Sequence, residues 1–447
     1  MAAGPAEGEK RVDLSLIVIV VVITALVFDF TNGFHDTANA MATSIATRAL
    51  EPRTAVIIAA VLNVVGAFLS VEVARTISSG LVDETRISPV VIFAGLIGAI
   101  IWNLVTWLLG LPSSSSHALF GGLIGATLVA AGLGAVDFGA VFSKVILPAV
   151  VSPVLAGITA LIATWLAYRT TARADDGTVK RGFRVGQVAS ASMVALAHGT
   201  SDAQKTMGVI TLTLITAGVL APDSGPPFWV ILAAGLAIGL GTYLGGWRII
   251  RTLGKGLVEI ESPQGMAAES SSAAIILTSA AGGMALSTTH VSTGSILGTG
   301  LGRKGADVRW GVAMRMVAAW LITLPCAAFV GFASWWVATG VSKMTNTMGG
   351  VIVDFILLIA MAAAIVIRAR MNPVDANNVN DDWDADSESV DSSMKTGTTA
   401  AAAKTTDRQP TTEHDPEMVG AGYPTPSDTV AEVVADPKHP GLGNDGK

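Results

Sequence analysis

The sequence predicts an all-α polytopic membrane protein made of two inverted repeats, with broken helices or re-entrant hairpins and about 10–12 membrane segments. Three observations predict this fold: an apolar composition, apolar blocks of membrane-spanning length, and a pair of polar motifs that occurs twice. Of the 447 residues, 51% are hydrophobic and 14% are charged, whereas about 25% of the residues in a soluble globular protein are charged. This composition excludes an ordinary water-soluble fold and makes the lipid bilayer an expected partner.

The apolar blocks are long enough to form membrane helices. A helix needs roughly 20 apolar residues to cross the hydrocarbon core, and ten or eleven blocks reach or approach that length. The blocks are residues 13–33, 54–74, 88–109, 112–132, 140–168, 186–218, 228–247, 268–284, 286–301, 310–338 and 347–367.

The ends of the chain differ from its apolar middle. Lys10 and Arg11 precede an apolar run as in a signal peptide, but the run continues into further membrane segments and is predicted to be the first helix. From about residue 371 the chain is polar and without apolar period, which predicts disorder. The predicted divisions are an N-terminal tail (1–12), a first transmembrane repeat (13–168), a basic cytoplasmic linker (169–185), a second repeat (186–338), an additional helix (339–370) and a disordered polar tail (371–447).

Loop charges predict the orientation, because cytoplasmic loops are enriched in Lys and Arg. An outside N-terminus places five basic connections on the inside. These connections hold Arg48 and Arg53; Arg169, Arg173, Lys180, Arg181 and Arg184; Arg248, Arg251 and Lys255; Arg303, Lys304 and Arg309; and Arg368 and Arg370. We therefore expect a multi-pass protein of the plasma (inner) membrane with a cytoplasmic C-terminal tail, although Lys10 and Arg11 oppose this weakly.

Two motifs occur in the same order in both halves. Each half opens with a long apolar stretch that holds an Asp, and each later contains a hydroxyl-rich interruption that ends in His. The distance from Asp36 to His117 is 81 residues, and from Asp202 to His290 it is 88. We interpret this as an internal repeat. Because each half has an odd number of crossings, the second half enters from the opposite side, and such transporters bind their cargo near the midplane.

The Asp motifs are the first candidate site. They read Asn32-Gly-Phe-His-Asp-Thr-Ala-Asn-Ala40 and His198-Gly-Thr-Ser-Asp-Ala-Gln-Lys-Thr206. Residues three apart share a helix face, so Asp36 with Asn39, and Asp202 with Lys205, should point into the same space. An ionised residue inside a bilayer costs at least about 2.5 kcal/mol and is a functional candidate for that reason. The alternative is that both Asp residues cap helices at the membrane surface.

The hydroxyl runs are the second candidate site. Small donors beside the N-terminus of a following helix suit an oxyanion, because the first N–H groups of a helix are unpaired. The runs are Ser113, Ser114, Ser115 and Ser116 before His117, and Ser287, Thr288 and Thr289 before His290. The alternative is an ordinary polar turn. His117 and His290 are candidate proton carriers or packing residues, and Glu269 is a candidate coupling residue or an interfacial one.

Electrostatics predicts cotransport. Two carboxylates that face a phosphate dianion in a site of low dielectric constant repel it, so cations or protons must neutralise the cluster. The first half has Asn39 where the second has Lys205, a fixed positive charge that could occupy the place of a bound sodium ion. This favours a proton as the coupling ion, with sodium or a divalent metal left open. Asp36 and Asp202 are the residues that would hold such a cation.

Together, these motifs resemble the inorganic phosphate transporter (PiT) family over residues 13–368. The family signature Gly-x-x-Asp-x-x-Asn-Ala fits the first copy, and the second departs from it at Lys205 and Thr206. This departure resembles the bacterial low-affinity branch, in which phosphate moves with protons, often as a neutral complex with a divalent metal. Sodium-coupled members typically keep Asn in both copies.

The resemblance implies a binding site and an assembly. It assigns phosphate and cation binding to Asp36, Asn39, Asp202, Ser113 to Ser116, Thr288 and Thr289, and we add Lys205 because of its charge. It implies inorganic phosphate as the partner and a homodimer as the assembly. No nucleic acid, catalytic residue or resident cofactor is expected.

Four alternatives remain open. Ser, Thr and backbone donors also suit sulfate or another oxyanion on the same fold, and a sodium-coupled symporter would share the site. Ser, His and Asp within the bilayer would also suit an intramembrane hydrolase, although no Gly-x-Ser-x-Gly motif occurs. A passive channel would not need the cation balance, and uphill accumulation would exclude it.

Overall fold

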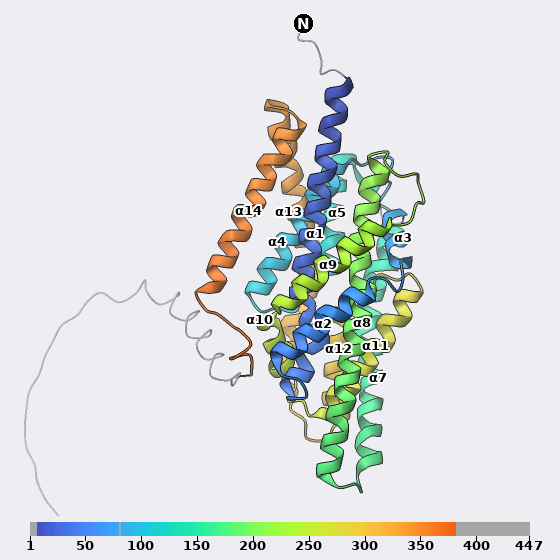
Figure 1. Cartoon of the computed structure of the whole chain (residues 1–447), viewed down its shortest axis with the longest axis vertical. Coiled ribbons are helices and arrows are strands. Elements are labelled where there is room, and N and C mark those ends of the chain that lie inside the picture. The colour runs from blue at the N-terminus through green and yellow to red at the C-terminus, as the bar shows by residue number, and fades with distance from the viewer. Residues whose placement is uncertain (1–6, 80–81, 381–447) are drawn as a thin grey trace, which may run out of the picture. The chain divides into compact units, whose positions relative to one another are not determined.

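The computed structural model describes residues 7–79 and 82–380, and helices dominate this part of the chain (Figure 1). Each of the predicted apolar blocks overlaps a helix. The α-helices are α1 (Glu7–Ala46), α2 (Pro52–Gly66), α3 (Glu72–Ser79), α4 (Pro89–Leu108), α5 (Ser115–Ala131), α6 (Phe138–Val141), α7 (Leu147–Thr171), α8 (Asp176–Thr216), α9 (Phe228–Leu244), α10 (Trp247–Arg251), α11 (Ser262–Ala281), α12 (Thr288–Gly302), α13 (Trp310–Met344) and α14 (Thr347–Arg370). Shorter helical turns are η1 (Leu133–Ala135), η2 (Phe142–Ile146) and η3 (Thr252–Gly256).

The helices repeat in order. The series α1, α2, α4, α5 and α7 corresponds to α8, α9, α11, α12 and α13, and α14 follows as an extra helix. Helices of one half pack on helices of the other half in matched pairs. The helix α1 packs on α9 as α8 packs on α2, and α5 packs on α13 as α12 packs on α7. The inverted-repeat fold is therefore visible in which helices touch.

Each repeat contains one helical hairpin, α4–α5 in the first and α11–α12 in the second. At the open end of each hairpin the flanking loops meet in an isolated β-bridge, Val82 with Val136 and Val258 with Val308. At the closed ends the two tips meet each other, since the Ser116 hydroxyl donates to the Leu286 carbonyl at 3.4 Å. The hydroxyl-rich interruptions of the sequence are these two tips.

Glycine allows the hairpins to approach the opposite repeat closely. A Cβ added to Gly125 on α5 would lie 2.0 Å from the Ala328 carbonyl oxygen on α13, and one added to Gly298 on α12 would lie 2.0 Å from the Gly157 carbonyl oxygen on α7. Backbone thus packs directly on backbone, as small residues permit between membrane helices. The recurring Gly residues after each His serve this contact.

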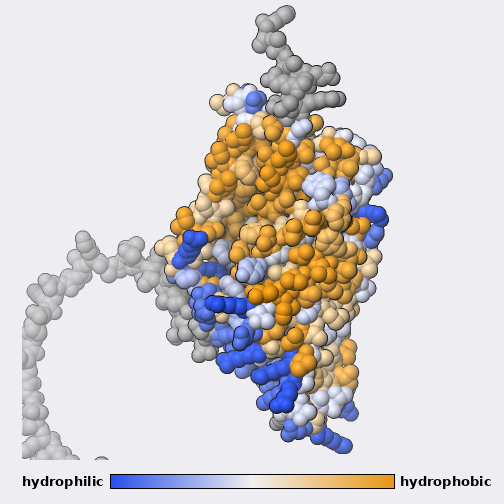
Figure 2. All heavy atoms as spheres, viewed as in Figure 1, coloured by the Kyte–Doolittle hydropathy of each residue, from blue (hydrophilic) through white to orange (hydrophobic). Residues whose placement is uncertain are grey.

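The outer surface is suited to lipid. Five helices in the described part are long and apolar enough to cross a membrane alone, and α9 with α10–η3, which bends by 63°, is together long and apolar enough for a broken span or a re-entrant loop. Large apolar side chains are exposed on α7, α13 and α14, among them Val150, Leu321, Phe329 and Ile356. Figure 2 shows apolar residues over much of one face and hydrophilic residues gathered toward its lower end. The chain is a multi-pass membrane protein.

Two connections have structure of their own. The predicted linker 169–185 is mostly helical, because α7 ends at Thr171 and α8 already begins at Asp176, where the Asp175 carboxylate accepts a hydrogen bond from the Thr178 N–H. Residues 371–380, assigned to the polar tail, contact the helical part: Arg248 donates to the Asn372 carbonyl and Val379 is buried. The rest of the predicted disordered tail, 381–447, lies outside the described residues.

We expect Gly298→Ala to destabilise the protein, because the new methyl group would meet backbone at α7 rather than a movable side chain. Overpacking of this kind costs typically about 1–3 kcal/mol. The measurement is the apparent unfolding temperature of the purified protein in detergent. Gly340→Ala is the control, since Gly340 is exposed on α13 with open space around its Cα and Ala is the better helix former. Equal unfolding temperatures for the two variants would contradict the packing role.

Candidate functional site

The two Asp motifs lie in the middle of long helices. Asp36 is on α1 and Asp202 on α8, both in continuous helix and both buried. Neither is a cap at a helix end, so the surface-cap alternative is wrong. Gly33 and Gly199, three residues before each Asp, lie where helices approach closely. A Cβ added to Gly33 would lie 2.3 Å from the Ile238 carbonyl oxygen, and one added to Gly199 would lie 2.2 Å from the Asn63 carbonyl oxygen.

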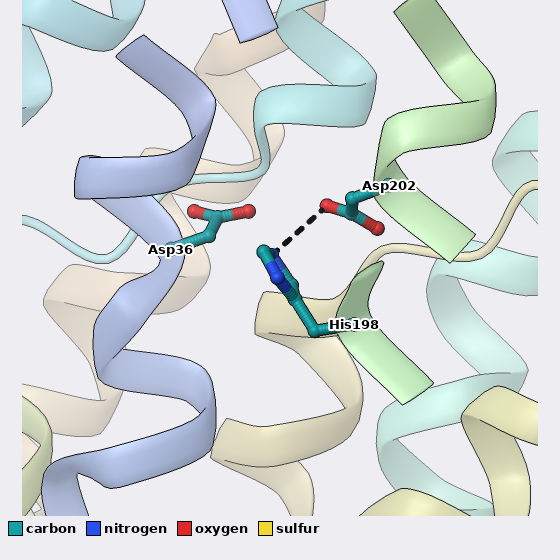
Figure 3. A group of neighbouring side chains, drawn as sticks. All are labelled: Asp36, His198 and Asp202. Atoms are coloured by element: carbon teal, nitrogen blue, oxygen red, sulfur yellow. Dashed lines mark ion pairs between the residues drawn. The ribbon is translucent and has the colours of Figure 1, made fainter. Parts of the chain in front are cut away.

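The structure brings the two carboxylates together. A carboxylate oxygen of Asp36, one of Asp202 and a ring nitrogen of His198 all lie within 4.8 Å of one another (Figure 3). All three side chains are buried. Carboxylate oxygens and an imidazole are ligands for a cation, so this is the point in the described part of the chain where positive charge would be held.

Asp202 is partly neutralised within the protein. The Lys205 ammonium donates to its Oδ1 at 2.6 Å, and the Thr288 hydroxyl donates to its Oδ2 at 3.3 Å. The Asn32 amide lies at 3.5 Å from the same Oδ2. Lys205 is fully buried, and an unpaired charge there would cost several kcal/mol. The pair is therefore a fixed part of the site.

The third residue after each Asp contacts the opposite hairpin. From α8, the Lys205 ammonium donates to Ser116 Oγ at 2.5 Å at the tip of the first hairpin. From α1, the Asn39 amide donates to Thr288 Oγ1 at 3.3 Å and to Thr289 Oγ1 at 3.0 Å at the tip of the second. These hydrogen bonds connect the two repeats at the charged centre.

Asp36 is held by a histidine that the sequence argument did not single out. His35 Nδ1 lies 2.6 Å from Asp36 Oδ1, and its Nε2 lies 3.2 Å from Thr106 Oγ1 and 3.4 Å from Ser113 Oγ. The Ser113 hydroxyl itself donates to Thr106 at 2.8 Å. Ser113, His35 and Asp36 thus form a Ser–His–Asp chain of contacts, in which the Ser113 hydroxyl is shared between the imidazole and Thr106.

His198 indicates that the site needs positive charge. The Asn63 amide donates to Thr242 at 2.8 Å, so its oxygen faces His198 Nδ1 at 3.1 Å and accepts that hydrogen. In neutral imidazole Nε2 is then an acceptor, yet it lies 3.4 Å from Asp202 Oδ2. Two acceptors at this distance repel unless the imidazole is protonated or a cation joins them.

The hydroxyl runs divide into different roles. Ser114 is the N-cap of α5 and Ser287 the N-cap of α12, each accepting the backbone N–H three residues on, at 3.2 and 3.3 Å. Ser113 supports His35 and Ser116 binds Lys205, as described above. The Ser115 hydroxyl is buried and has no partner in the described part of the chain. A buried polar group left in this way costs about 1–3 kcal/mol, so Ser115 is the serine best suited to meet a ligand.

Glu269 forms a separate polar cluster. It lies on α11 and accepts four hydrogen bonds, from Thr43 Oγ1 and Ser44 Oγ at 2.5 Å, from Ser190 Oγ at 2.6 Å and from Gln187 Nε2 at 3.3 Å. It is buried within the protein. Thr43 follows Asp36 by two helical turns, which places Glu269 about 10 Å further along α1.

His117 and His290 lie where the hairpin tips meet. Their rings stack with centroids 4.9 Å apart and an interplanar angle of 17°, and Trp320 packs on His290 at 4.2 Å. His117 Nδ1 contacts Ser114 Oγ at 2.6 Å, and His290 Nδ1 donates to the Ala149 carbonyl at 3.2 Å. No described contact joins either ring to Asp36 or Asp202, so the geometry favours the packing role over proton transfer.

Four residues of the charged centre were missed: His35, His198, Asn32 and Thr106. The signal for two of them was present, because Asn32 and His198 occupy matching positions of the repeat, four residues before each Asp, and so share its helix face. Thr106 could not be found in this way. Its place opposite His35 depends on how α4 packs against α1.

Inverted repeats, paired hairpins and a buried charged centre are typical of secondary transporters. Residues 32–178 and 167–331 match the model of the phosphate transporter family. The chain belongs to this family. It is therefore a membrane transporter with phosphate as substrate and not an enzyme, so the hydrolase alternative is wrong.

Relatives and a solved structure agree with this assignment. A protein of Mycobacterium tuberculosis (strain H37Rv), described as a probable low-affinity inorganic phosphate transporter, is 56% identical over 395 residues, which covers 88% of this chain and 92% of the relative. A Bacillus subtilis protein of the same description is 44% identical over 71% of this chain and 96% of its own length. A solved sodium-dependent phosphate transporter aligns with a TM-score of 0.66 and 25% identity, over 73% of this chain and all of its own.

We expect Ser115→Ala to raise the phosphate concentration for half-maximal uptake by about 10-fold, because a lost hydrogen bond to a charged ligand is worth about 1.5 kcal/mol or more. The measurement is initial uptake into proteoliposomes at a series of phosphate concentrations. Ser279→Ala is the matched control, since the buried Ser279 hydroxyl donates to the Ile276 carbonyl of its own helix. An unchanged half-maximal concentration for Ser115→Ala would remove this serine from the site.

Proposed function

We propose that the protein imports inorganic phosphate by symport, with protons as the coupling ions and with a metal-phosphate complex as a possible form of the cargo. The observation that supports this is the meeting of Asp36 and Asp202 within 4.8 Å, with Lys205 fixed beside one of them. The substrate would bind where the charged centre faces the tips of both hairpins. Its proposed ligands are Asp36, Asn39, Asp202, Lys205, Ser113 to Ser116, Thr288 and Thr289.

The charges explain why phosphate would not move alone. Asp36 and Asp202 together carry two negative charges, and Lys205 cancels one of them. A phosphate dianion that enters this buried centre adds two more, and charges a few ångströms apart repel by about 4 kcal/mol even at an effective dielectric constant of 20. Binding therefore requires positive charge to enter with the anion. The donors of Ser115 and of the N-terminus of α5 can bind its oxygens once that charge is present.

Lys205 supports the proton over sodium. In the first repeat Asn39 offers an amide oxygen that has no partner in the described part of the chain, a group that can bind a cation. In the second repeat the ammonium of Lys205 takes the matching position and already contacts Asp202 and Ser116. A sodium ion at this place would meet a fixed positive charge. Glu269, with its shell of hydroxyl donors, is a further candidate for proton coupling.

Sodium coupling is the second candidate, and one observation favours it. The solved structure that aligns over 73% of this chain is described as a sodium-dependent phosphate transporter. Asp36 and the unpaired oxygens of Asn32 and Asn39 could contribute to a sodium site in the first repeat, where no lysine intervenes. The two candidates differ in which gradient drives uptake.

Orientation and assembly are part of the same proposal. The basic connections support an outside N-terminus and a cytoplasmic C-terminal tail, because Lys and Arg are enriched on the cytoplasmic side. The exposed apolar faces of α7, α13 and α14 leave room for a second copy as well as for lipid. We propose a homodimer in the plasma (inner) membrane.

We expect Asp36→Asn to lose phosphate uptake almost completely in proteoliposomes. Breaking a buried charge array typically costs about 3–5 kcal/mol, which corresponds to a loss of more than about 100-fold. Asp354→Asn is the matched control, because Asp354 is also buried but bonds Ser334 between α14 and α13. Wild-type rates for Asp36→Asn would overturn the proposed site, and comparable losses in both variants would indicate a general effect on folding.

We expect uptake by the wild type to follow an imposed pH gradient, inside alkaline, and to be insensitive to replacement of sodium by potassium. The reason is that Lys205 fills the position of a second cation. Uptake of labelled phosphate against each gradient measures this, with excess sulfate as competitor to test the anion. Strict dependence on sodium would overturn proton coupling, and equal competition by sulfate would overturn selectivity for phosphate.

A further inference from the structure

Asp29 is a buried carboxylate that none of the contacts described so far includes. It lies on α1, two helical turns before Asp36, and its side chain is fully buried. Neither of its oxygens has a hydrogen-bond partner within residues 7–79 and 82–380. Leaving an ionised carboxylate in this condition costs several kcal/mol in protein interiors. Such a residue inside a membrane helix calls for a function.

Asp29 is the first member of a polar stripe along α1. The stripe consists of Asp29, Asn32, Asp36, Asn39 and Thr43, all buried. Their spacing alternates between three and four residues, which keeps them on one face of a helix. The other four members contact Asp202, His35, the second hairpin and Glu269 respectively. Asp29 therefore continues the line of groups that make the charged centre.

Asp29 also marks a place where the two repeats differ. When Asp36 is matched to Asp202, the counterpart of Asp29 on α8 is Ala195, which carries no charge. The two departures of the second motif are Lys205 for Asn39 and Thr206 for Ala40. Thr206 Oγ1, like both oxygens of Asp29, is buried without a hydrogen-bond partner in the described part of the chain. The acid that breaks the repeat on α1 and the base that breaks it on α8 thus lie on helices that pack on each other.

The surroundings leave the charge of Asp29 without a dedicated partner. On α8, the Lys205 ammonium already bonds Asp202 and Ser116. On α1 the nearest ionisable groups, His35 and Asp36, bond each other. The helices α4 and α9, which pack closely on α1, contain no Asp, Glu, Lys, Arg or His. Glu269 lies four turns further along α1, at Thr43.

A proton suits this position better than a metal ion. A hard cation is held by about six oxygen ligands, and the described residues whose ligand atoms gather as a possible metal site are Asp36, His198 and Asp202, without Asp29. A proton needs one oxygen. Protonated Asp29 is a neutral carboxylic acid with one O–H to donate, which removes the cost of the buried charge.

We propose that Asp29 is the proton-binding site that couples phosphate movement to the proton gradient. On the side where phosphate enters, a carboxylate oxygen of Asp29 accepts one proton from water and forms an O–H bond. With Asp36, Asp202 and Lys205 ionised, this changes the formal charge of the four groups from −2 to −1 before the anion binds. On the opposite side the O–H bond breaks and the proton returns to water. This inference rests on the proposed phosphate symport.

Asp29→Asn tests the inference by separating two activities of the same reconstituted protein. We expect phosphate accumulation driven by a pH gradient to fall at least 10-fold, because the amide cannot take up and release a proton. Exchange of labelled for unlabelled phosphate at equal pH on both sides needs no net proton movement, and we expect it to persist. Asp354→Asn is the matched buried-carboxylate control, and a pH-sensitive dye inside the vesicles reports proton entry on addition of phosphate.

Asp29→Glu provides a second variant that keeps the acid and is therefore informative if Asp29→Asn does not fold. We expect it to retain accumulation with a shifted pH profile. Gradient-driven accumulation in Asp29→Asn equal to wild type, loss of exchange together with accumulation, or an unshifted profile in Asp29→Glu would each overturn the role of Asp29. If the wild type itself does not respond to the pH gradient, proton coupling fails irrespective of Asp29.

Discussion

The buried charge at the meeting of α1 and α8 is the constraint on which the rest of the structure depends. Asp36 and Asp202 lie within 4.8 Å of each other, and lipid surrounds the helices that hold them. Carboxylates this close inside a protein are stable only with hydrogen bonds and compensating positive charge. His35, Lys205 and the hairpin hydroxyls supply part of this. Under the proposed symport, the remaining positive charge enters with the cargo, which connects the architecture to cotransport.

The inverted repeat provides the geometry for that centre. Because each hairpin packs on the last long helix of the other repeat, neither half can complete the site alone. Glycines let these contacts form through the backbone, which leaves the tips meeting each other beside the two Asp helices. Movement of one hairpin relative to the other would therefore change contacts at Thr288, Thr289 and Ser116 together. Under the proposed transport cycle, these same residues would respond both to the cargo and to movement of the hairpins.

The motif spacing was enough to predict the repeats, the hairpin tips and the pairing of Asp36 with Asp202, because covalent order and helix period determine them. The partners of these residues depend on packing between distant helices, which spacing does not encode. Thr106 beside His35 and Ser190 beside Glu269 are examples. The serine run also looked uniform in sequence, yet its members cap a helix, support a histidine, bind a lysine or remain unpaired. The stacking of His117 on His290 needed the tips to meet, which only the folded chain shows.

Symmetry explains the scaffold, and departures from symmetry explain its chemistry. Residues that match between the repeats, such as Gly33 with Gly199 and Gly125 with Gly298, form close helix contacts. Residues without a match carry most of the additional charge: Lys205 stands opposite Asn39 in the repeat, and Asp29 stands opposite Ala195. In a strictly symmetric centre, the two repeats would present the same side chains to a cation. Lys205 in the second half and Asp29 in the first make the two repeats different. A single proton on Asp29 therefore changes the net charge of the centre.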